Sequence, residues 1–268
     1  MHENGLSERL DGFERQLKLV EDYAIKGFWT TLDKMYAASL PSRVLSCIIC
    51  GCTARHSEFE KVVDQCIFGG GTLERYKCQE CDTIFGPMKY LDLPEDVVSL
   101  DYSLLYSRYS EADLTEVESH AFHSLKPAKG GRYLNWGCGA WSKSVQELRA
   151  QGWDVIGYEP SAGPIAGEYV VTKREELMPP YDGIFSNNVV EHFRDPVGQF
   201  REFGALLSED GTMAHSSPCY VYCYGYTRFH VYFPIGRSIE ELARRTSFEV
   251  TDRSNVGQYI NVGFRRTR

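Results

Sequence analysis

From Arg132 to the C-terminus, short apolar runs alternate with amphipathic segments, and this alternation constrains the fold more than any other feature of the sequence. The short runs have the length of strands, whereas the longer segments repeat their apolar residues at helical spacing. Such alternation is typical of a mainly parallel sheet with helices on both faces. The predicted strands are 132–136, 153–159, 181–188 and 211–218, the predicted helices are 142–152, 195–207 and 238–247, and 248–254 with 258–266 are predicted to form a closing antiparallel hairpin.

A glycine-rich turn joins the first predicted strand to the first predicted helix. The stretch "YLNWGCGAWS", residues 133–142, contains Gly137 and Gly139. Glycine lets the backbone approach a ligand closely, and the turn at this place in α/β folds binds nucleotide-like ligands. Glu159 ends the next strand, where a carboxylate can accept hydrogen bonds from both hydroxyls of a ribose. The pattern therefore predicts a nucleoside site at this edge of the sheet.

These segments resemble the motifs of a known enzyme family. "YLNWGCGAWSKSVQELRAQGWDVIGYEPS" looks like the first two motifs of the class I S-adenosylmethionine-dependent methyltransferases, and "YDGIFSNNVVEHFRDPVGQFREFGALLSEDGTMAHSSP" resembles their later motifs. The resemblance covers residues 120–268. It implies an α/β, Rossmann-like fold with a mostly parallel seven-stranded sheet whose last strand is antiparallel. It also implies S-adenosylmethionine as the cofactor.

The same resemblance implies which residues would bind the cofactor. Gly137 and Gly139 would line its methionine part, Glu159 would hold the ribose, and Asn187 with Asn188 would lie beside the sulfonium. The full predicted set is Trp136, Gly137, Cys138, Gly139, Glu159, Pro160, Asn187, Asn188, Tyr106 and Tyr109.

Three members of this set require a separate explanation. Tyr106 and Tyr109 lie in a stretch that resembles the Tyr-x-x-Tyr segment that closes over the cofactor in related sugar methyltransferases; an aromatic packing strip is the alternative. Cys138 is predicted to be a small filler, because the loop contacts the cofactor through its backbone. Many family members carry a carboxylate in the strand before the loop, where this chain has Asn135.

The predicted catalytic residues are Glu191, His192 and His230. Methyl transfer to a hydroxyl requires a positioned acceptor and a base, and histidine suits the second task because its pKa lies near working pH. His230 precedes a segment similar to one in sugar methyltransferases that carry an N-terminal zinc module, which favours it as the base. Two alternatives remain: a structural role for either histidine, and a divalent ion bound by Glu191, His192 and a later histidine, with Asn188 in place of a further glutamate.

Two Cys-x-x-Cys pairs predict a structural zinc site. "CIIC" and "CQEC" place Cys47, Cys50, Cys78 and Cys81 in two tight turns, and four thiolates complete a tetrahedral Zn²⁺ site. A bound metal would also stabilise a segment with few apolar residues for a core of its own. The alternatives are a redox pair, unrelated free thiols, an iron in the same site, or a ligand taken from Cys52, Cys66 or His56.

Four parts are predicted along the chain: an N-terminal helical segment (1–45), a zinc-binding module (46–92), a connector or lid over the cofactor (93–130) and the methyltransferase domain (131–268). Within the first part, apolar residues recur at spacings of three and four over 8–38 and predict a helix. This helix is expected to pack on the core, with a dimerisation or substrate-side helix as the alternative. The oligomeric state is left open.

Charge and composition narrow the function. The formal net charge of −8 argues against a surface that binds many nucleic-acid phosphates. The N-terminus is charged rather than signal-like, and no stretch reaches membrane-spanning length, so a cytoplasmic protein is expected. The leading interpretation is methylation of a sugar hydroxyl in a nucleotide-linked sugar or a polysaccharide precursor. Alternatives are another small metabolite or an amine, an RNA acceptor, and a non-catalytic zinc-bearing interaction protein.

Overall fold

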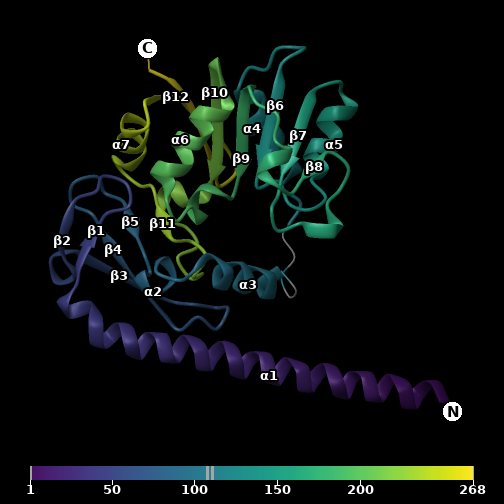
Figure 1. Ribbon diagram of the computed structural model, residues 1–268, viewed down its shortest axis with the longest axis vertical. Helices are drawn as coiled ribbons and strands as arrows, with labels where there is room; N and C mark the ends of the chain where they lie inside the picture. Colours follow the sequence, from purple (N-terminus) through teal and green to yellow (C-terminus); the bar gives the residue numbers. More distant parts are fainter. Residues whose placement is uncertain (1, 107–108, 110–111, 268) are drawn as a thin grey trace.

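The computed structural model describes residues 2–106, 109 and 112–267 and contains the predicted seven-stranded sheet (Figure 1). The strand order is β12-β13-β10-β9-β6-β7-β8. From β10 to β8 all neighbours run parallel, whereas β13 is antiparallel to both β10 and β12. This confirms the Rossmann-like methyltransferase fold. The strands are β6 (Arg132–Trp136), β7 (Asp154–Tyr158), β8 (Val170–Val171), β9 (Tyr181–Asn187), β10 (Leu207–Ser217), β12 (Phe248–Val256) and β13 (Tyr259–Arg266).

Helices cover both faces of this sheet. Because side chains alternate along a strand, Tyr133 and Leu134 point to opposite faces. Tyr133 belongs to a core cluster that includes residues of α4 (Thr115–Ser124) and α5 (Lys143–Ala150). Leu134 belongs to a second cluster that includes residues of α6 (Pro196–Leu206) and α7 (Ser238–Arg245). The sheet therefore has a helical layer on each side, as the alternation in the sequence predicts.

The predicted strands and helices agree with the observed ones to within a few residues, because capping residues and apolar spacing near each end determine where the element begins and ends. Asp195 accepts a hydrogen bond from the backbone N–H of Gly198 at 2.9 Å, and Pro196 occupies the first turn, so α6 begins where the sequence places it. The strand β8 was not predicted. It is two residues long and carries no periodicity that could reveal it.

The cysteine-rich segment forms two small sheets. β1 (Val44–Ser46) pairs with β2 (Thr53–Arg55) as a hairpin. A second sheet has the order β11-β5-β4-β3, from β3 (Glu60–Gln65), β4 (Thr72–Lys77), β5 (Ile84–Phe85) and β11 (Tyr232–Phe233). Because β11 follows the main-sheet strand β10 in the chain, the predicted zinc module and the predicted methyltransferase domain share this sheet. The short helix α2 (Met88–Leu91) and then α3 (Glu95–Tyr106) lead to the large sheet.

The helix α1 (His2–Ser39) extends away from the rest of the molecule (Figure 1). Near its C-terminal end Trp29 is buried and stacks on Tyr90, with ring centroids 6.0 Å apart. Further towards the N-terminus, Leu10, Phe13 and Leu17 are exposed. The expectation that this helix packs on the core is therefore right for its C-terminal part and wrong for the rest. Among the described residues, no helix has the length and apolar character needed to cross a membrane.

Candidate active site

The glycine turn lies between β6 and α5, at the carboxyl edge of the parallel strands. Gly137 has φ +68° and Gly139 has φ +71°, a backbone region that residues with a Cβ rarely adopt. A Cβ on Gly137 would lie 2.5 Å from Val189, so this glycine is also required for close packing against the end of β9. A Cβ on Gly139 would meet nothing within 4 Å. The turn therefore exposes backbone to an open space.

Glu159 lies beside this turn. Its carboxylate accepts a hydrogen bond from the N–H of Gly139 at 3.2 Å and another from the N–H of Ser161 at 3.1 Å. The Ser161 hydroxyl donates a third at 2.5 Å. Glu159 is half-buried, and the adjacent Pro160 is exposed. These bonds fix the carboxylate against the loop. The ribose-binding role of Glu159 stays a prediction.

Two other predicted cofactor residues have buried side chains. Trp136 is buried against Tyr158, with ring centroids 4.4 Å apart. The thiol of Cys138 packs over Gly157 of β7, where a side chain would have no room, and burial raises its pKa well above the ordinary value. The thiol also donates to the carbonyl of Gly139 in the same loop, at 3.3 Å. The filler role of Cys138 stays a prediction.

One carboxylate that the sequence did not reveal lies under the same loop. Glu118 of α4 accepts a hydrogen bond from the side-chain amide of Asn135 at 2.8 Å and another from the hydroxyl of Ser144. Asn135 and Ser144 are both 1% exposed. Glu118 thus brings a negative charge to the position where family members often have a carboxylate in the strand itself. Glu118 also helps to raise the pKa of Cys138, although burial is the larger cause.

Asn187 and Asn188 lie at the carboxyl end of β9. Asn187 is 7% exposed, and neither its side-chain oxygen nor its nitrogen has a hydrogen-bond partner among the described residues. Asn188 has φ +55°, and its backbone N–H donates to the carbonyl of Ser216 at 2.9 Å. Buried amides without partners are costly in a folded chain. Asn187 is therefore placed to hydrogen-bond a ligand.

Glu191, His192 and His230 come together beside these asparagines. One side-chain ligand atom from each lies within 4.8 Å of the others, and the two imidazole centroids are 4.9 Å apart. Glu191 and His192 belong to a short helical turn after β9, whereas His230 precedes β11. The N–H of Val231 donates to the carbonyl of Glu191 at 2.9 Å, which holds the two segments together. Folding thus brings the three predicted catalytic residues into one cluster.

Burial keeps both imidazoles neutral. It lowers the pKa of His192 to about 4, against the opposing effect of the Phe229 and Asn188 carbonyls. It also lowers the pKa of His230 well below 6.5, with further contributions from His192 and Arg75. A neutral imidazole can accept a proton or bind a metal ion. Neutral His192 and His230 can therefore serve either as a base or as metal ligands.

The segment that carries His230 is held by the cysteine-rich sheet. Arg75 of β4 is fully buried and donates to the carbonyls of Gly225 at 2.6 Å, Thr227 at 2.7 Å and His230 at 3.0 Å. Five donors in a rigid fork allow one guanidinium to bind several carbonyls. Arg75 was not singled out from the sequence, because only folding brings β4 next to this segment.

The connector contacts the same cluster through α3. The hydroxyl of Tyr102 lies 2.8 Å from Nδ1 of His192, and that nitrogen is 3.0 Å from the carbonyl of Phe229. Tyr109 is 46% exposed, and its ring contacts Phe68 at 5.8 Å between centroids. Tyr106 ends α3, and its side chain lies outside the described part of the structure. The roles of Tyr106 and Tyr109 as a lid stay predictions.

A family model described as a methyltransferase domain matches residues 110–253, more than half of the chain. The chain belongs to this methyltransferase family. In structure the methyltransferase resembles the 1,6-didemethyltoxoflavin-N1-methyltransferase of Burkholderia thailandensis, at 16% identity and a TM-score of 0.50 over 73% of this chain and 96% of that one. It also matches an S-adenosylmethionine-dependent methyltransferase from Mesorhizobium loti, at 16% identity and a TM-score of 0.43 over 56% and 97% of the two chains. No curated protein sequence matches the chain.

The methyltransferase also gathers its four predicted zinc ligands. The sulfurs of Cys47 and Cys81 are 3.7 Å apart and those of Cys50 and Cys78 are 3.5 Å apart, and all four lie within 4.8 Å of one another. Four thiolates on one Zn²⁺ with bonds of about 2.3 Å have sulfurs separated by roughly 3.8 Å. The spacing therefore fits a tetrahedral zinc site. The alternative ligands Cys52, Cys66 and His56 are not members of this cluster.

The two turns of the cluster have the same backbone geometry. The N–H of Gly51 donates to the carbonyl of Cys47 at 2.9 Å, and the N–H of Asp82 donates to that of Cys78 at 2.9 Å. Gly51 and Asp82 both have positive φ values, +77° and +68°. This matched pair of turns directs four sulfurs to one point.

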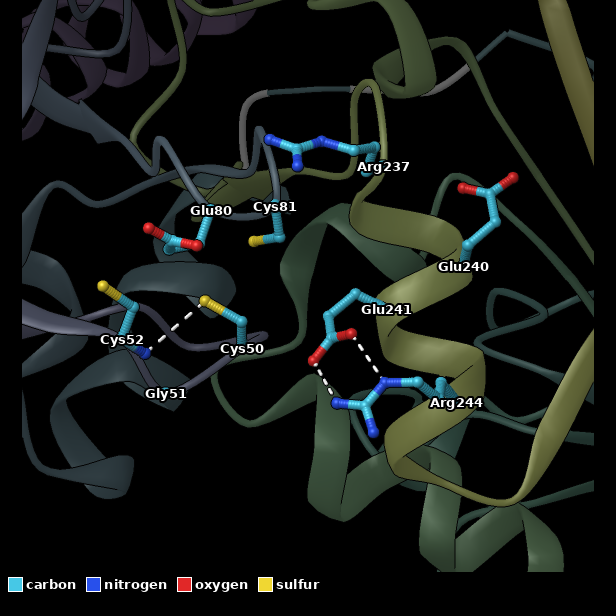
Figure 2. A pocket seen from close by; sticks show the side chains of 9 residues that line it. All are labelled: Cys50, Gly51, Cys52, Glu80, Cys81, Arg237, Glu240, Glu241 and Arg244. Atoms are coloured by element: carbon cyan, nitrogen blue, oxygen red, sulfur yellow. Dashed lines mark hydrogen bonds and ion pairs between the residues drawn. The ribbon is translucent and has the colours of Figure 1, made fainter.

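A cavity of about 650 Å³ lies between the cysteine cluster and α7. Figure 2 shows Cys50 and Cys81 with Glu80 on one side, and Glu240, Glu241 and Arg244 of α7 on the other. Arg244 binds the carboxylate of Glu241 through two hydrogen bonds of 2.8 Å. None of the predicted cofactor or catalytic residues lines this cavity. It therefore gives solvent access to the cysteine cluster and is separate from the active site.

Proposed function

We propose that this methyltransferase uses S-adenosylmethionine to methylate a sugar hydroxyl. The observation that carries the proposal is the cluster of Glu191, His192 and His230, which lies beside Asn187 at the carboxyl end of β9. In open α/β sheets ligands bind outside the carboxyl ends of the strands. The glycine turn is at the same edge, so a methyl donor bound by the turn would present its reactive carbon near the cluster.

The residues around the turn fit the cofactor. Glu159 would accept the ribose hydroxyls, and the open face of Gly139 allows backbone contact with the methionine part. The methionine part carries an ammonium group, which requires acceptors. Glu118 and the side-chain oxygen of Asn187 lie at this side of the sheet and would supply them. When bound, S-adenosylmethionine would supply an electrophilic methyl carbon on a sulfonium.

His230 is the proposed base. Its imidazole is neutral because burial holds its pKa well below 6.5, so a ring nitrogen can accept the proton of the acceptor hydroxyl. A pKa this low also weakens the base, so the positive charge that develops on the ring requires a partner. Arg75 fixes the backbone carbonyl of His230, and His192 with Tyr102 forms the adjoining wall. Glu191 is fully buried and would balance the positive charge that develops on the imidazole.

A second mechanism is supported by the same donor set. Two neutral imidazoles and one carboxylate form the ligand set that binds divalent transition metals with open positions. In that case Glu191, His192 and His230 would hold an ion that binds the acceptor oxygen and lowers its pKa. The metal-assisted mechanism is supported by the short distances between the three ligand atoms, which all lie within 4.8 Å of one another.

One experiment separates the two mechanisms. Methyl transfer is measured after chelation, with and without added Mn²⁺, and the retained zinc of the cysteine cluster is measured in the same sample. Activity that survives chelation and is lost in His230→Gln supports the base. Activity that disappears on chelation and returns with Mn²⁺ supports the ion.

The sugar acceptor is supported by two features. The first is the order of the two parts along the chain: a cysteine cluster precedes the methyltransferase domain, and this order resembles that of sugar methyltransferases with an N-terminal zinc module. The second is the aromatic segment before His230, where Tyr226 is 40% exposed and Tyr224 is partly exposed. Exposed aromatic faces can pack on the apolar faces of sugar rings, and their hydroxyls can hydrogen-bond sugar hydroxyls. Another small metabolite or an amine is the alternative acceptor.

A panel of acceptors tests this part of the proposal. Nucleotide sugars, free sugars, a heteroaromatic amine and a structured RNA are each incubated with the enzyme and with S-adenosylmethionine labelled at its methyl group. We expect label on a nucleotide sugar. Label on the amine or the RNA alone would contradict the sugar acceptor while leaving the methyltransferase activity intact.

We also propose that Cys47, Cys50, Cys78 and Cys81 bind one structural Zn²⁺. The matched turns, the sulfur distances and the burial of three of the four thiols support this. All four positions of the tetrahedron would be filled by protein, so the ion would stabilise the fold and take no part in the reaction.

A further inference from the structure

The helix α1 carries two separate apolar stripes. The first consists of Ile25, Trp29, Leu32 and Tyr36, which are buried or partly buried in the main core. The second consists of Leu10, Phe13, Leu17, Val20 and Ala24, all of which are exposed. At about 100° per residue, the second stripe points roughly a third of a turn away from the first. The body of the protein that binds the first stripe therefore leaves the second one uncovered.

The exposed stripe is large for a surface helix. The side chains of Leu10, Phe13, Leu17 and Val20 are between 50% and 66% exposed. Single exposed apolar residues are normal, but a contiguous row of them marks an interaction surface. This part of α1 extends beyond the rest of the molecule, so both sides of the stripe are accessible (Figure 1).

The spacing of the stripe suits pairing with a helix that carries an equivalent stripe. Leu10, Phe13, Leu17, Val20 and Ala24 are separated by three, four, three and four residues. This is the repeat of a two-stranded coiled coil, in which each stripe packs against an equivalent stripe. We propose that α1 pairs with the α1 of a second copy of this chain, in a parallel coiled coil that makes the enzyme a dimer.

The charges beside the stripe favour the parallel orientation. Arg9 and Glu14 flank the stripe at the positions that meet across a parallel pair, so Arg9 of each copy would face Glu14 of the other. In an antiparallel pair, the side of the stripe that carries Glu14 and Glu21 would face itself, which places like charges together. The parallel pair has two-fold symmetry and leaves both catalytic bodies at the same end.

The same segment is poorly suited to a lipid surface. Helices that lie on anionic membranes have a polar face rich in Lys and Arg. Between residues 8 and 26, α1 has five acidic residues and four basic ones. A second copy of the chain is therefore the partner that the stripe fits best.

Sedimentation equilibrium of the full chain tests the proposal with a matched pair of variants. Leu17→Glu places a charge in the stripe, whereas Leu19→Glu places the same charge at an exposed position outside it, where Leu19 is 68% exposed. We expect wild type and Leu19→Glu to be dimers at micromolar concentration, and Leu17→Glu to have a dissociation constant raised by roughly 100-fold or more. Circular dichroism and binding of S-adenosylhomocysteine verify that each variant is folded.

Charge exchange tests the orientation. Arg9→Glu alone and Glu14→Arg alone each place like charges across the parallel pair, so each homodimer should be weakened. A mixture of the two variants restores both opposite-charge pairs and should form the heterodimer preferentially. A wild-type chain that stays monomeric throughout the micromolar range would overturn the proposal. Equal effects of Leu17→Glu and Leu19→Glu on the dissociation constant of the dimer would also overturn it. If the mixture of Arg9→Glu and Glu14→Arg associated no more tightly than either variant alone, the parallel orientation would be refuted.

Discussion

At the scale of single residues, the proposed cofactor site consists of polar groups that the fold holds in place before any ligand binds. Glu159 is fixed by the N–H groups of Gly139 and Ser161, and Glu118 is fixed by Asn135 and Ser144. Pre-organised acceptors bind a ligand without a further cost of ordering. We therefore expect the proposed site to favour a nucleoside with an attached ammonium group.

Replacing Glu159 tests the ribose contact. In Glu159→Gln one acceptor becomes a donor, and the charge-assisted bonds to the ribose hydroxyls are lost. We expect the dissociation constant of S-adenosylhomocysteine to rise roughly 10- to 100-fold, measured by calorimetry. Glu209→Gln is the control, because Glu209 is exposed and lies towards the other end of β10. Equal affinity in Glu159→Gln and wild type would remove Glu159 from the ribose site.

Sequence patterns predicted Glu159 and missed Glu118 for a physical reason. Glu159 follows the strand next in sequence after the glycine turn. Its position beside the turn can therefore be inferred from the order of strands and helices. Glu118 reaches the same site from α4, and nothing in its local sequence indicates that it will meet Asn135. Arg75 was missed in the same way, since its partners lie in a segment far along the chain. Contacts between distant segments appear only when the topology is known.

At the scale of elements, the cysteine-rich sheet supports the active site. The turn of Cys78 and Cys81 connects β4 to β5, whereas the turn of Cys47 and Cys50 connects β1 to β2. β5 in turn pairs with β11 directly after His230. Arg75 of β4 binds the carbonyls of the same segment. A structural ion in the cluster would thus stabilise the acceptor side of the active site at a distance.

Removing zinc ligands tests this link. Cys78→Ser with Cys81→Ser should release about one Zn²⁺ per chain, measured by metal analysis, because a serine hydroxyl is a poor ligand for this ion. The free energy of unfolding should fall by several kcal/mol, and the reaction should be lost while affinity for S-adenosylhomocysteine changes little. Cys223→Ser serves as the control, since Cys223 is outside the cluster. Full retention of zinc in the double variant would refute the ligand set.

Most strands and helices of the large sheet followed from periodicity, whereas the shortest strands and the partner of α1 did not. β8 and β11 have two residues each, too few for any period to appear. The apolar spacing in α1 correctly predicts a helix. However, it does not indicate which surface packs against the apolar stripe. Part of that helix packs on the body, and the stripe from Leu10 to Ala24 is left for another partner.

At the scale of the whole molecule, stability should depend on pH through His215. This residue lies in β10 at 0% exposure, stacked on Phe203 with centroids 5.2 Å apart, and burial lowers its pKa to about 3. An unfolded histidine has a pKa of about 6.5. Between these two values the unfolded chain binds the additional proton. Stability must therefore fall as the pH decreases from about 6.5 towards 3.

Urea unfolding at pH 7, 6 and 5 measures this dependence. His215 alone should contribute a loss of up to about 1.4 kcal/mol per pH unit below its unfolded pKa. His215→Phe keeps an aromatic ring among Phe200, Phe203 and Phe264 and should reduce the slope by that contribution, whatever it does to stability at pH 7. An unchanged slope in the variant would show that His215 is not the titrating group.

We propose that the glycine turn, Glu159 and the carboxyl end of β9 form one site for S-adenosylmethionine. Calorimetric titration of the full chain with S-adenosylhomocysteine tests it most directly, because binding can be measured before the acceptor is known. We expect one molecule to bind per chain with micromolar or tighter affinity and to be displaced by S-adenosylmethionine. No detectable binding by the folded, zinc-loaded protein would contradict it.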